Sequence, residues 1–286
     1  MKLQSNHVAE CIRQASLALT EHHVEAPLRA ATLIMCHVLG ITQVQLLAGR
    51  DADSLTEQAL QKYQKLIERR KNHEPLAYIL GTKEFYGLDF EVSNHVLIPR
   101  PETELLVDWV LETFGPDQSF RLCDVGCGSG AIVVSVAKHR SKALCLAIDR
   151  SEKALEVTMH NAQRLGVQIE GMQSNLLEGV SRVFEVVVSN LPYVPTSDLS
   201  TLAPELAHEP VMALDGGEDG LNLIRPLIAQ LEPRLTQEGW VFLEYGQGQT
   251  GAIGKCLKEH GFDTVEVRKD AAGIERVIRA KRTSVV

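Results

Sequence analysis

Apolar positions in the first 75 residues recur at the three- and four-residue spacing of amphipathic helices. One such series covers residues 8–19 and a second covers residues 28–39. The sequence Ser-Leu-Thr-Glu at residues 54–57 has the pattern of a capping box and predicts that a further helix begins there. Glu74-Pro75 predicts its end, because proline disfavours helix in the residue before it. Residues 1–75 are therefore predicted to form a small all-helical domain.

The pattern changes after Pro75. Strand-like runs at residues 78–81 and 85–90 are broken by glycine and predict a hairpin within a linker. From residue 121 onward, apolar runs alternate with helical patterns, and this alternation predicts an α/β fold with a doubly wound, mostly parallel sheet. The runs lie at residues 122–125, 144–148, 183–188 and 240–243, and the helical patterns include 131–139 and 151–165. Residues 264–267 and 276–279 predict an antiparallel strand pair at the end of the chain.

Charge narrows the range of partners. The 286 residues include 29 Lys and Arg against 37 Asp and Glu, so the net charge is −8. Residues 1–80 hold 9 basic and 8 acidic residues, which leaves 20 and 29 for residues 81–286. Proteins that grip a phosphate backbone usually carry a basic surplus. The charge therefore favours a partner other than nucleic acid.

Hydropathy and cysteine content indicate the compartment. No apolar run approaches the roughly 18 residues that span a bilayer, and the first ten residues are polar. The six cysteines include no C-x-x-C pair and no zinc-like spacing, so we expect reduced structural thiols and no metal site. These features predict a cytoplasmic protein that does not contact a membrane.

A glycine-rich loop follows the first strand of the predicted sheet. Its residues are Gly126, Cys127, Gly128, Ser129 and Gly130, and a predicted helix comes directly after them. Glycine permits tight turns and close approach of a ligand to the backbone, and a helix start presents free N–H groups. The same glycines also satisfy the dinucleotide pattern G-x-G-x-x-G/A, so the loop predicts a cofactor site without deciding which cofactor it binds.

Asp149 ends the next strand, about twenty residues beyond the glycines. A carboxylate at this point can accept hydrogen bonds from both hydroxyls of a ribose. It can also serve, with Ser151, at the start of the following helix. Nicotinamide cofactors and S-adenosylmethionine both contain this ribose, so the choice between them stays open here.

The tetrapeptide Asn190-Leu191-Pro192-Tyr193 resolves that choice. It follows the strand at residues 183–188, so it lies at the carboxyl edge of the sheet, where ligands bind in open α/β folds. An Asn followed by any residue, Pro and an aromatic residue resembles the motif of methyltransferases that modify planar amino groups. Such enzymes act on adenine amines or glutamine amides.

The residue types of this motif suit that chemistry. An amide NH₂ has a delocalised lone pair, so catalysis depends mainly on orientation and electrostatics. The Asn190 side-chain oxygen and the Leu191 carbonyl can each accept one of its N–H bonds. Pro192 fixes the backbone, and Tyr193 can pack on the planar group. No strong base is needed, because the methylated nitrogen becomes acidic and then loses its proton.

Further segments resemble the release-factor glutamine methyltransferase family (PrmC/HemK), within the class I S-adenosylmethionine-dependent methyltransferases. The Pro-Arg-Pro-Glu-Thr sequence at residues 99–103 is the most specific of them, because most methyltransferases share the glycine loop. With the helical N-terminal domain, the resemblance covers essentially the whole chain. The matching segments are residues 74–81, 85–88, 97–104, 213–221, 244–246 and 270–277.

The resemblance implies an enzyme that methylates the glutamine of the Gly-Gly-Gln tripeptide in class 1 peptide-chain release factors, using S-adenosylmethionine. It implies a seven-stranded Rossmann-like domain at residues 99–286, a hairpin linker at 76–98 and a helical substrate-recognition domain at 1–75. A monomer is expected.

Residue roles also follow from the resemblance. The implied glutamine site contains residues 190–193, with Arg100 and Glu102 nearby. Residues 99–104 also suit an ordinary Pro-punctuated helix start with Glu102 and Glu104 in its first turn. The implied cofactor residues are Gly126, Cys127, Gly128, Ser129, Gly130, Asp149, Asn175, Leu176 and Asn190.

Two residues depart from the family pattern. The family usually has Pro where this chain has Leu191, which makes the presentation of the backbone carbonyl less rigid. Asn175 stands where methyltransferases commonly place an acidic residue that meets the adenine amino group. Its amide oxygen can still accept a hydrogen bond.

Alternative functions follow from these departures. Asn-Leu-Pro-Tyr is typical of ribosomal-RNA adenine dimethyltransferases, which are the main alternative. That family needs a basic face and carries its helical domain after the core, whereas this chain is acidic and its helical segment comes first. A cofactor-binding scaffold without transfer activity is a further alternative, and an NAD-dependent hydride-transfer enzyme is another.

Overall fold

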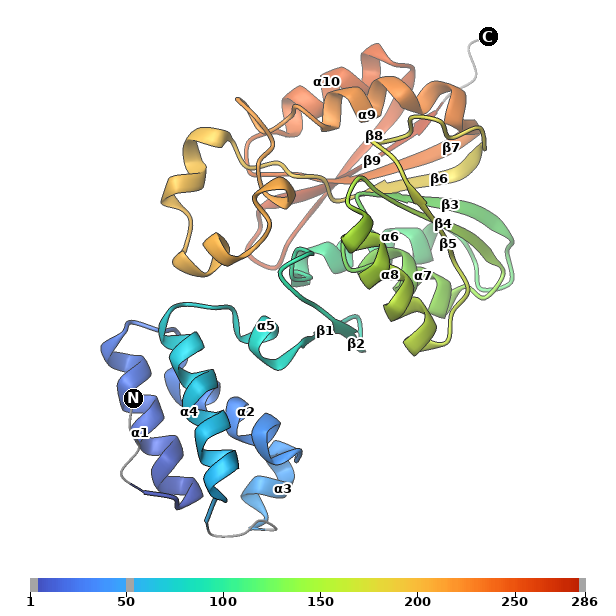
Figure 1. The fold of residues 1–286 in the computed structure, drawn as a ribbon. Helices are drawn as coiled ribbons and strands as arrows, with labels where there is room; N and C mark the ends of the chain where they lie inside the picture. The colour runs from blue at the N-terminus through green and yellow to red at the C-terminus, as the bar shows by residue number, and fades with distance from the viewer. Residues whose placement is uncertain (1–4, 50–53, 283–286) are drawn as a thin grey trace. The chain divides into compact units, whose positions relative to one another are not determined.

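The computed structural model describes residues 5–49 and 54–282 (Figure 1). Within them the chain forms two compact units. One contains the described residues up to Thr82 together with Ala203–His208. The other contains Lys83–Leu202 and the described residues from Glu209 onward, and it includes the glycine loop and residues 190–193.

The first unit is a helical bundle with its own apolar core. Helices α1, α2 and α4 pack against one another and bury residues such as Leu19, Ile34 and Ile67. Tyr63 is also buried in this core, and its hydroxyl donates to the Ala31 carbonyl at 3.1 Å. The helices are α1 (Val8–Glu21), α2 (Pro27–Leu39), α3 (Gln43–Leu47), α4 (Glu57–Lys71) and α5 (Leu76–Leu80).

Two local predictions in this unit are wrong. The residue that caps α4 is Thr56 and not Ser54, because the Thr56 hydroxyl accepts from the Ala59 N–H at 3.2 Å. Residues 78–81, predicted as strand, belong to helix α5 and its cap. Pro75 precedes this short helix and Gly81 closes it in a left-handed conformation. Ile79 packs in the helical core, so tertiary burial outweighs the strand preference of the sequence.

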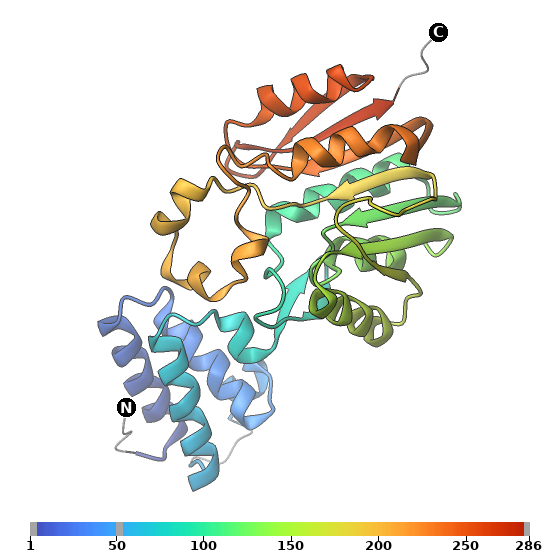
Figure 2. The ribbon, with the colours of Figure 1, turned by 45° about the horizontal axis from the view of Figure 1, so that its top comes forward.

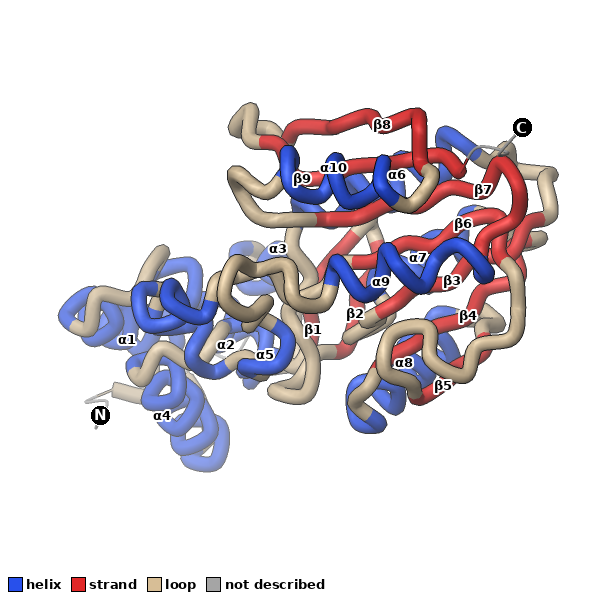
Figure 3. The backbone as a smooth tube through the Cα atoms, turned by 90° about the horizontal axis from the view of Figure 1, so that it is seen from above, coloured by secondary structure: helices blue, strands red, loops and turns tan. Residues whose placement is uncertain are grey.

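The second unit is built on a seven-stranded sheet in the order β5-β4-β3-β6-β7-β9-β8 (Figure 3). All neighbouring strands are parallel except β9, which runs antiparallel to both β7 and β8. The predicted fold class and the closing antiparallel pair are thereby confirmed. The strands are β3 (Phe120–Val125), β4 (Ala143–Asp149), β5 (Glu170–Gln173), β6 (Phe184–Ser189), β7 (Leu235–Glu244), β8 (Phe262–Lys269) and β9 (Glu275–Arg282).

Helices cover both faces of this sheet (Figures 1 and 2). Side chains alternate between the faces along each strand: Leu122 packs in the core beneath α6 and α7, whereas Cys123 packs in the core beneath α9. This alternation requires strands that are apolar on both sides, as the sequence has them. The helices are α6 (Glu104–Thr113), α7 (Ala131–His139) and α8 (Glu152–Leu165) on one face, and α9 (Ile224–Leu231) and α10 (Thr250–Glu259) on the other.

A hairpin of β1 (Thr82–Phe85) and β2 (Leu88–Glu91) leads into this sheet unit. Buried Asn161 of α8 joins the hairpin to the glycine loop. Its amide exchanges hydrogen bonds with the backbone N–H and carbonyl of Glu91 and also donates to the Ser129 carbonyl at 2.9 Å. At the turn, the Tyr86 hydroxyl donates to Asp108 of α6 at 2.8 Å. These contacts fix the hairpin to the helices beside the loop.

The chain passes from β3 outward to β5 and then returns to place β6 on the other side of β3. The carboxyl ends of β3 and β6 are therefore neighbours, with Val125 opposite Ser189. Strand order reverses at this point, and in open α/β sheets such a switch point is where ligands bind. In the described part of the chain, no helix has both the length and the apolar character to cross a bilayer.

The cap of α4 provides a test of the helical unit. Replacing Thr56 by Ala removes the acceptor for the Ala59 N–H and should lower the opening free energy of the first turn of α4 by about 1 kcal/mol. Amide hydrogen exchange on the full chain measures this local opening. Ser54→Ala is the matched control and should change it by less than about 0.5 kcal/mol. A larger effect at Ser54 than at Thr56 would contradict the assignment.

Candidate functional site

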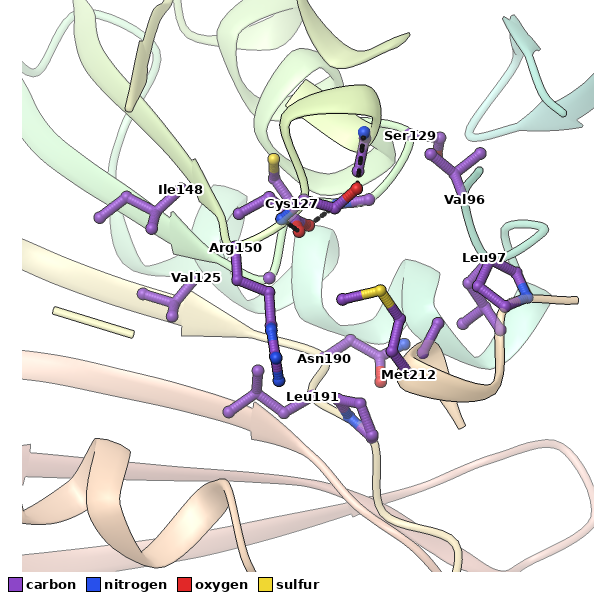
Figure 4. A pocket seen from close by; sticks show the side chains of 18 of the residues that line it. Val96, Leu97, Val125, Cys127, Ser129, Ile148, Arg150, Asn190, Leu191 and Met212 are labelled. Carbon is purple, nitrogen blue, oxygen red and sulfur yellow. Dashed lines mark hydrogen bonds between the residues drawn. The ribbon is translucent and has the colours of Figure 1, made fainter. Parts of the chain in front are cut away.

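A cleft of about 980 Å³, including space open to solvent, lies at the carboxyl ends of β3, β4 and β6. Figure 4 shows Val125 and Ile148 at the strand ends on one side of the cleft, and Val96 and Leu97 on the opposite side. Met212 and Asn190 lie between them. The cleft is also lined by Cys127, Gly128, Asp149, Arg150, Asn175, Leu191 and Pro192.

The glycine loop forms one wall because its backbone follows a path that side chains would block. Gly126 has φ +77°, and a Cβ there would lie 2.9 Å from Cδ2 of Leu191. Gly130 has φ +80°, and its Cβ would lie 2.9 Å from Cγ2 of Thr158. The N–H of Gly126 donates to the Ile148 carbonyl at 2.8 Å, which holds the loop to β4. Glycine is therefore required at both positions by conformation and by space.

Asp149 faces the cleft with free acceptor capacity. One carboxylate oxygen accepts from the Gly128 N–H at 3.0 Å, and the other accepts from the Ser151 N–H at 2.8 Å. A carboxylate has about four acceptor sites, so acceptor capacity remains for a ligand. Burial raises the pKa of Asp149, and the three backbone N–H groups around it oppose that shift. The arrangement fits a vicinal diol, such as a ribose.

Asp124 lies buried beneath the loop at the end of β3. One oxygen accepts from the Val133 N–H of α7 at 3.2 Å, and the other has no hydrogen-bond partner among the described residues. Burial raises its pKa to about 7, and the charge of Asp149 adds to the shift. An unpartnered buried carboxylate oxygen is costly, and Asp124 lies behind the residues that line the cleft.

Residues 190–193 follow β6, and the first three of them line the cleft. The Ser189 hydroxyl donates to the Val125 carbonyl at 2.5 Å and fastens the start of this segment to β3. Asn190 donates through Nδ2 to Thr103 Oγ1 at 3.1 Å. The Leu191 side chain is buried beneath Gly126, so this residue packs the segment against the glycine loop.

Tyr193 is anchored at both ends. Its hydroxyl donates to the buried carboxylate of Glu244 at 3.3 Å, and its carbonyl accepts from Gln249 Nε2 at 2.9 Å. Gly220 passes so close that a Cβ would lie 2.1 Å from that carbonyl. Burial and the nearby charge of Glu244 raise the pKa of Tyr193. The segment 213–221, singled out in the sequence, thus shapes the backbone beside the site.

Two predicted substrate residues lie in the segment that precedes α6. Arg100 lines the cleft, but its guanidinium forms an ion pair with Glu209, whose side chain is 1% exposed. Glu209 also accepts from the Ile98 N–H at 3.0 Å, so it fastens residues 98–100 to the start of the 209–213 segment. Glu102 does not line the cleft and lies near Arg276.

Asn175 and Leu176 lie beside Asp149 in the cleft lining. Asn175 donates through Nδ2 to Glu178 at 2.8 Å, which leaves its amide oxygen as an acceptor. Leu176 has φ +55°, an uncommon conformation for a non-glycine residue, and such backbone strain is frequent at binding sites.

Most residues predicted for the site line the same cleft, but Gly130, Tyr193 and Glu102 do not. Gly130 immediately precedes α7 and occupies its N-cap position. The sequence patterns assigned no role to Asp124 or Glu209. They also did not single out several apolar residues of the cleft lining, which include Val96, Met212 and Leu223. The signal available in the sequence for Asp124 and Glu244 was the position of each acidic residue within or directly after an apolar run, which predicts a buried side chain.

The strand order, the glycine loop and the cleft at the β3–β6 switch define a Rossmann-like methyltransferase. The solved structure of a methyltransferase from Pyrococcus furiosus has this fold, with a TM-score of 0.54 and 19% identity over 71% of this chain and 92% of that chain. The family model described as "Methyltransferase small domain" matches residues 102–241, and the one described as "PrmC N-terminal domain" matches residues 10–81.

Curated relatives identify the particular family. The release factor glutamine methyltransferase of Thermodesulfovibrio yellowstonii is 39% identical over 258 residues, which cover 88% of this chain and 91% of that protein. The one from Neisseria gonorrhoeae is 39% identical over 254 residues, with 88% and 92% covered. The chain belongs to the family of release factor glutamine methyltransferases.

The raised pKa of Asp124 predicts a pH dependence of stability in the ligand-free protein. The unfolded chain releases this proton near pH 3.8 and the folded chain near pH 7, so the folded state binds more protons between these values. The free energy of unfolding should therefore fall as pH rises through this window, by about 1 kcal/mol per pH unit from this group.

Asp124→Asn tests that dependence, because it cannot release the proton and should flatten the slope measured by urea unfolding between pH 5 and 7. Asp89→Asn removes an exposed carboxylate and controls for net charge. Equal slopes in wild type and Asp124→Asn would contradict the assignment.

Proposed function

We propose that this protein transfers a methyl group from S-adenosylmethionine to the side-chain amide nitrogen of the glutamine in the Gly-Gly-Gln motif of class 1 release factors. One observation carries the proposal. Asn190 and Leu191 line the same cleft as Asp149, whose carboxylate can accept hydrogen bonds from a diol. Family membership supports the same reaction, since the curated relatives are named for it.

The cleft fits S-adenosylmethionine as cofactor. Asp149 would hold the ribose hydroxyls with its free acceptor sites, and Asn175 would accept from the adenine amino group. The glycine loop, from Gly126 to Gly130, would lie against the methionine portion, with the unpartnered oxygen of Asp124 beneath it. The bound cofactor supplies an electrophilic methyl group.

The protein's own part in the reaction is to bind and orient the glutamine amide. With Nδ2 of Asn190 committed to Thr103, Oδ1 is the end available to accept one amide N–H. The Leu191 carbonyl would accept the other N–H, and the ring of Tyr193 would pack near the planar group. After transfer the nitrogen is acidic, and its proton leaves to water. Orientation of the substrate in this way can account for a large part of the reduction in the activation free energy.

Leu191 in place of the family's usual Pro is compatible with this role. Its side chain is 5% exposed and packs beneath Gly126, so burial restrains the backbone that a proline ring would otherwise restrict. The carbonyl that accepts from the substrate is present in either case. The Asn-Leu-Pro-Tyr sequence therefore does not require an RNA substrate.

We further propose that the helical unit helps to hold the release factor, and that the enzyme acts as a cytoplasmic monomer without direct contact to nucleic acid. The acidic net charge of −8 supports a protein partner. The six cysteines, all of which lie among the described residues, are thiols rather than disulfides and five are buried, which suits a reducing compartment.

Labelling of the release factor tests the reaction. With radiolabelled S-adenosylmethionine, the protein should label a class 1 release factor at the Gly-Gly-Gln glutamine and leave the Gly-Gly-Ala variant unlabelled. Peptide mass mapping locates the methyl group. Equal labelling of both release factors would exclude the proposed site of methylation, and label on ribosomal RNA instead would favour the adenine-modifying alternative.

Asn190→Ala separates catalysis from cofactor binding. The variant loses the acceptor for the substrate N–H, so kcat should fall by about 100-fold or more, while the affinity for S-adenosylhomocysteine should stay within a few-fold in calorimetry. Asn94→Ala, an exposed residue outside the cleft lining, is the control and should match wild type. Loss of cofactor affinity with unchanged kcat would show that Asn190 serves the cofactor instead.

A further inference from the structure

A buried carboxylate joins the two sides of the proposed glutamine site. Glu244 ends β7, is 1% exposed and accepts one hydroxyl on each oxygen. Thr103 donates to Oε2 at 2.7 Å, and Tyr193 donates to Oε1 at 3.3 Å. Burial raises the pKa of Glu244 to about 7 and nearby Glu102 adds to the shift, while the two hydroxyls and the charge of Arg276 oppose it.

Thr103 lies inside a continuous helical stretch, because the 3-10 turn Pro101–Thr103 runs directly into α6. Its side chain makes no hydrogen bond to the start of the helix and donates to Glu244 instead. Thr103 is also 4% exposed and belongs to the segment 97–104 that resembles the family most specifically. Helix capping therefore does not explain why threonine stands at this position.

The Thr103 hydroxyl has one proton to donate and lies between Glu244 and Asn190. Ionised Glu244 can only accept, so Thr103 must donate its single proton to it. The Thr103 oxygen can then act only as an acceptor toward Asn190, whose Nδ2 lies 3.1 Å away. An asparagine amide has nearly the same shape in its two flipped orientations, so hydrogen bonding decides between them. The two hydrogen bonds that link Glu244, Thr103 and Asn190 select the amide orientation in which Oδ1 of Asn190 points away from Thr103.

We propose that Thr103 and Glu244 are positioning residues that fix the amide orientation of Asn190, so that its oxygen and not its NH₂ group meets the substrate amide. The proposal rests on the proposed function, because it assigns Oδ1 the task of accepting a glutamine N–H. A flipped Asn190 would set donor against donor and repel the substrate. Through Tyr193, the same carboxylate holds the aromatic side of the site.

Thr103→Val tests the proposal, since valine matches threonine in shape and lacks the hydroxyl. At about pH 8.5, above the pKa of Glu244, kcat for release-factor methylation should fall by about 10- to 100-fold. The KM for S-adenosylmethionine should stay within a few-fold. Thr103→Ser restores the hydroxyl and should recover kcat to within a few-fold of wild type. A wild-type kcat in Thr103→Val would overturn the proposal.

Thr113→Val is the matched control, because it removes a hydroxyl that donates to a backbone carbonyl at the far end of α6. It should leave kcat unchanged. A loss of kcat in Thr103→Val that Thr103→Ser does not recover would also overturn the proposal, because it would show that packing at this position matters and not the hydroxyl.

The side-chain NH₂ signals of Asn190 give a readout that needs no turnover. In ¹⁵N-labelled protein, these protons should exchange slowly in wild type and Thr103→Ser and at least tenfold faster in Thr103→Val. Equal exchange in all three proteins would overturn the proposal. If wild type does not label the glutamine, the proposed function fails, and the exchange rates still decide whether Thr103 holds the Asn190 amide.

Discussion

The lateral pairing of β3 with β6 is the constraint on which the site depends. These strands are separated by two further strands in the chain, yet Val125 and Ser189 are register partners and the Ser189 hydroxyl bonds to the Val125 carbonyl. Because both strands end at the same edge, the glycine loop and residues 190–193 face each other across one cleft. Leu191 fills the space that the missing side chain of Gly126 leaves, so the two walls are also packed together.

Buried carboxylates organise this edge of the sheet. Asp124 and Glu244 each end a strand, and burial raises the pKa of both to about 7. Their surroundings differ: Glu244 binds two hydroxyls, whereas one oxygen of Asp124 has no partner among the described residues. A satisfied buried carboxylate can orient its neighbours. The unpartnered oxygen of Asp124 instead carries a desolvation cost that no described residue offsets.

The two departures from the family pattern are accommodated by local contacts. The NH₂ group of Asn175 donates to Glu178, which leaves its amide oxygen as an acceptor in the cleft lining, and Leu191 is restrained by burial. Both side chains are thus held by partners that lie outside the motifs themselves. A comparison of motifs alone does not show these contacts.

The sequence by itself determined the strand–helix alternation, the glycine loop, Asp149 and the tetrapeptide at residues 190–193, because these depend on local periodicity and on chemistry that adjacent residues carry. It did not determine that residues 78–80 are helical, since burial in the helical core decides that. Nor did it show that Thr103 contacts Asn190 and Glu244, from which it is separated by 87 and 141 positions. Only tertiary structure brings such distant residues together, because packing of α6 against the sheet sets their distance.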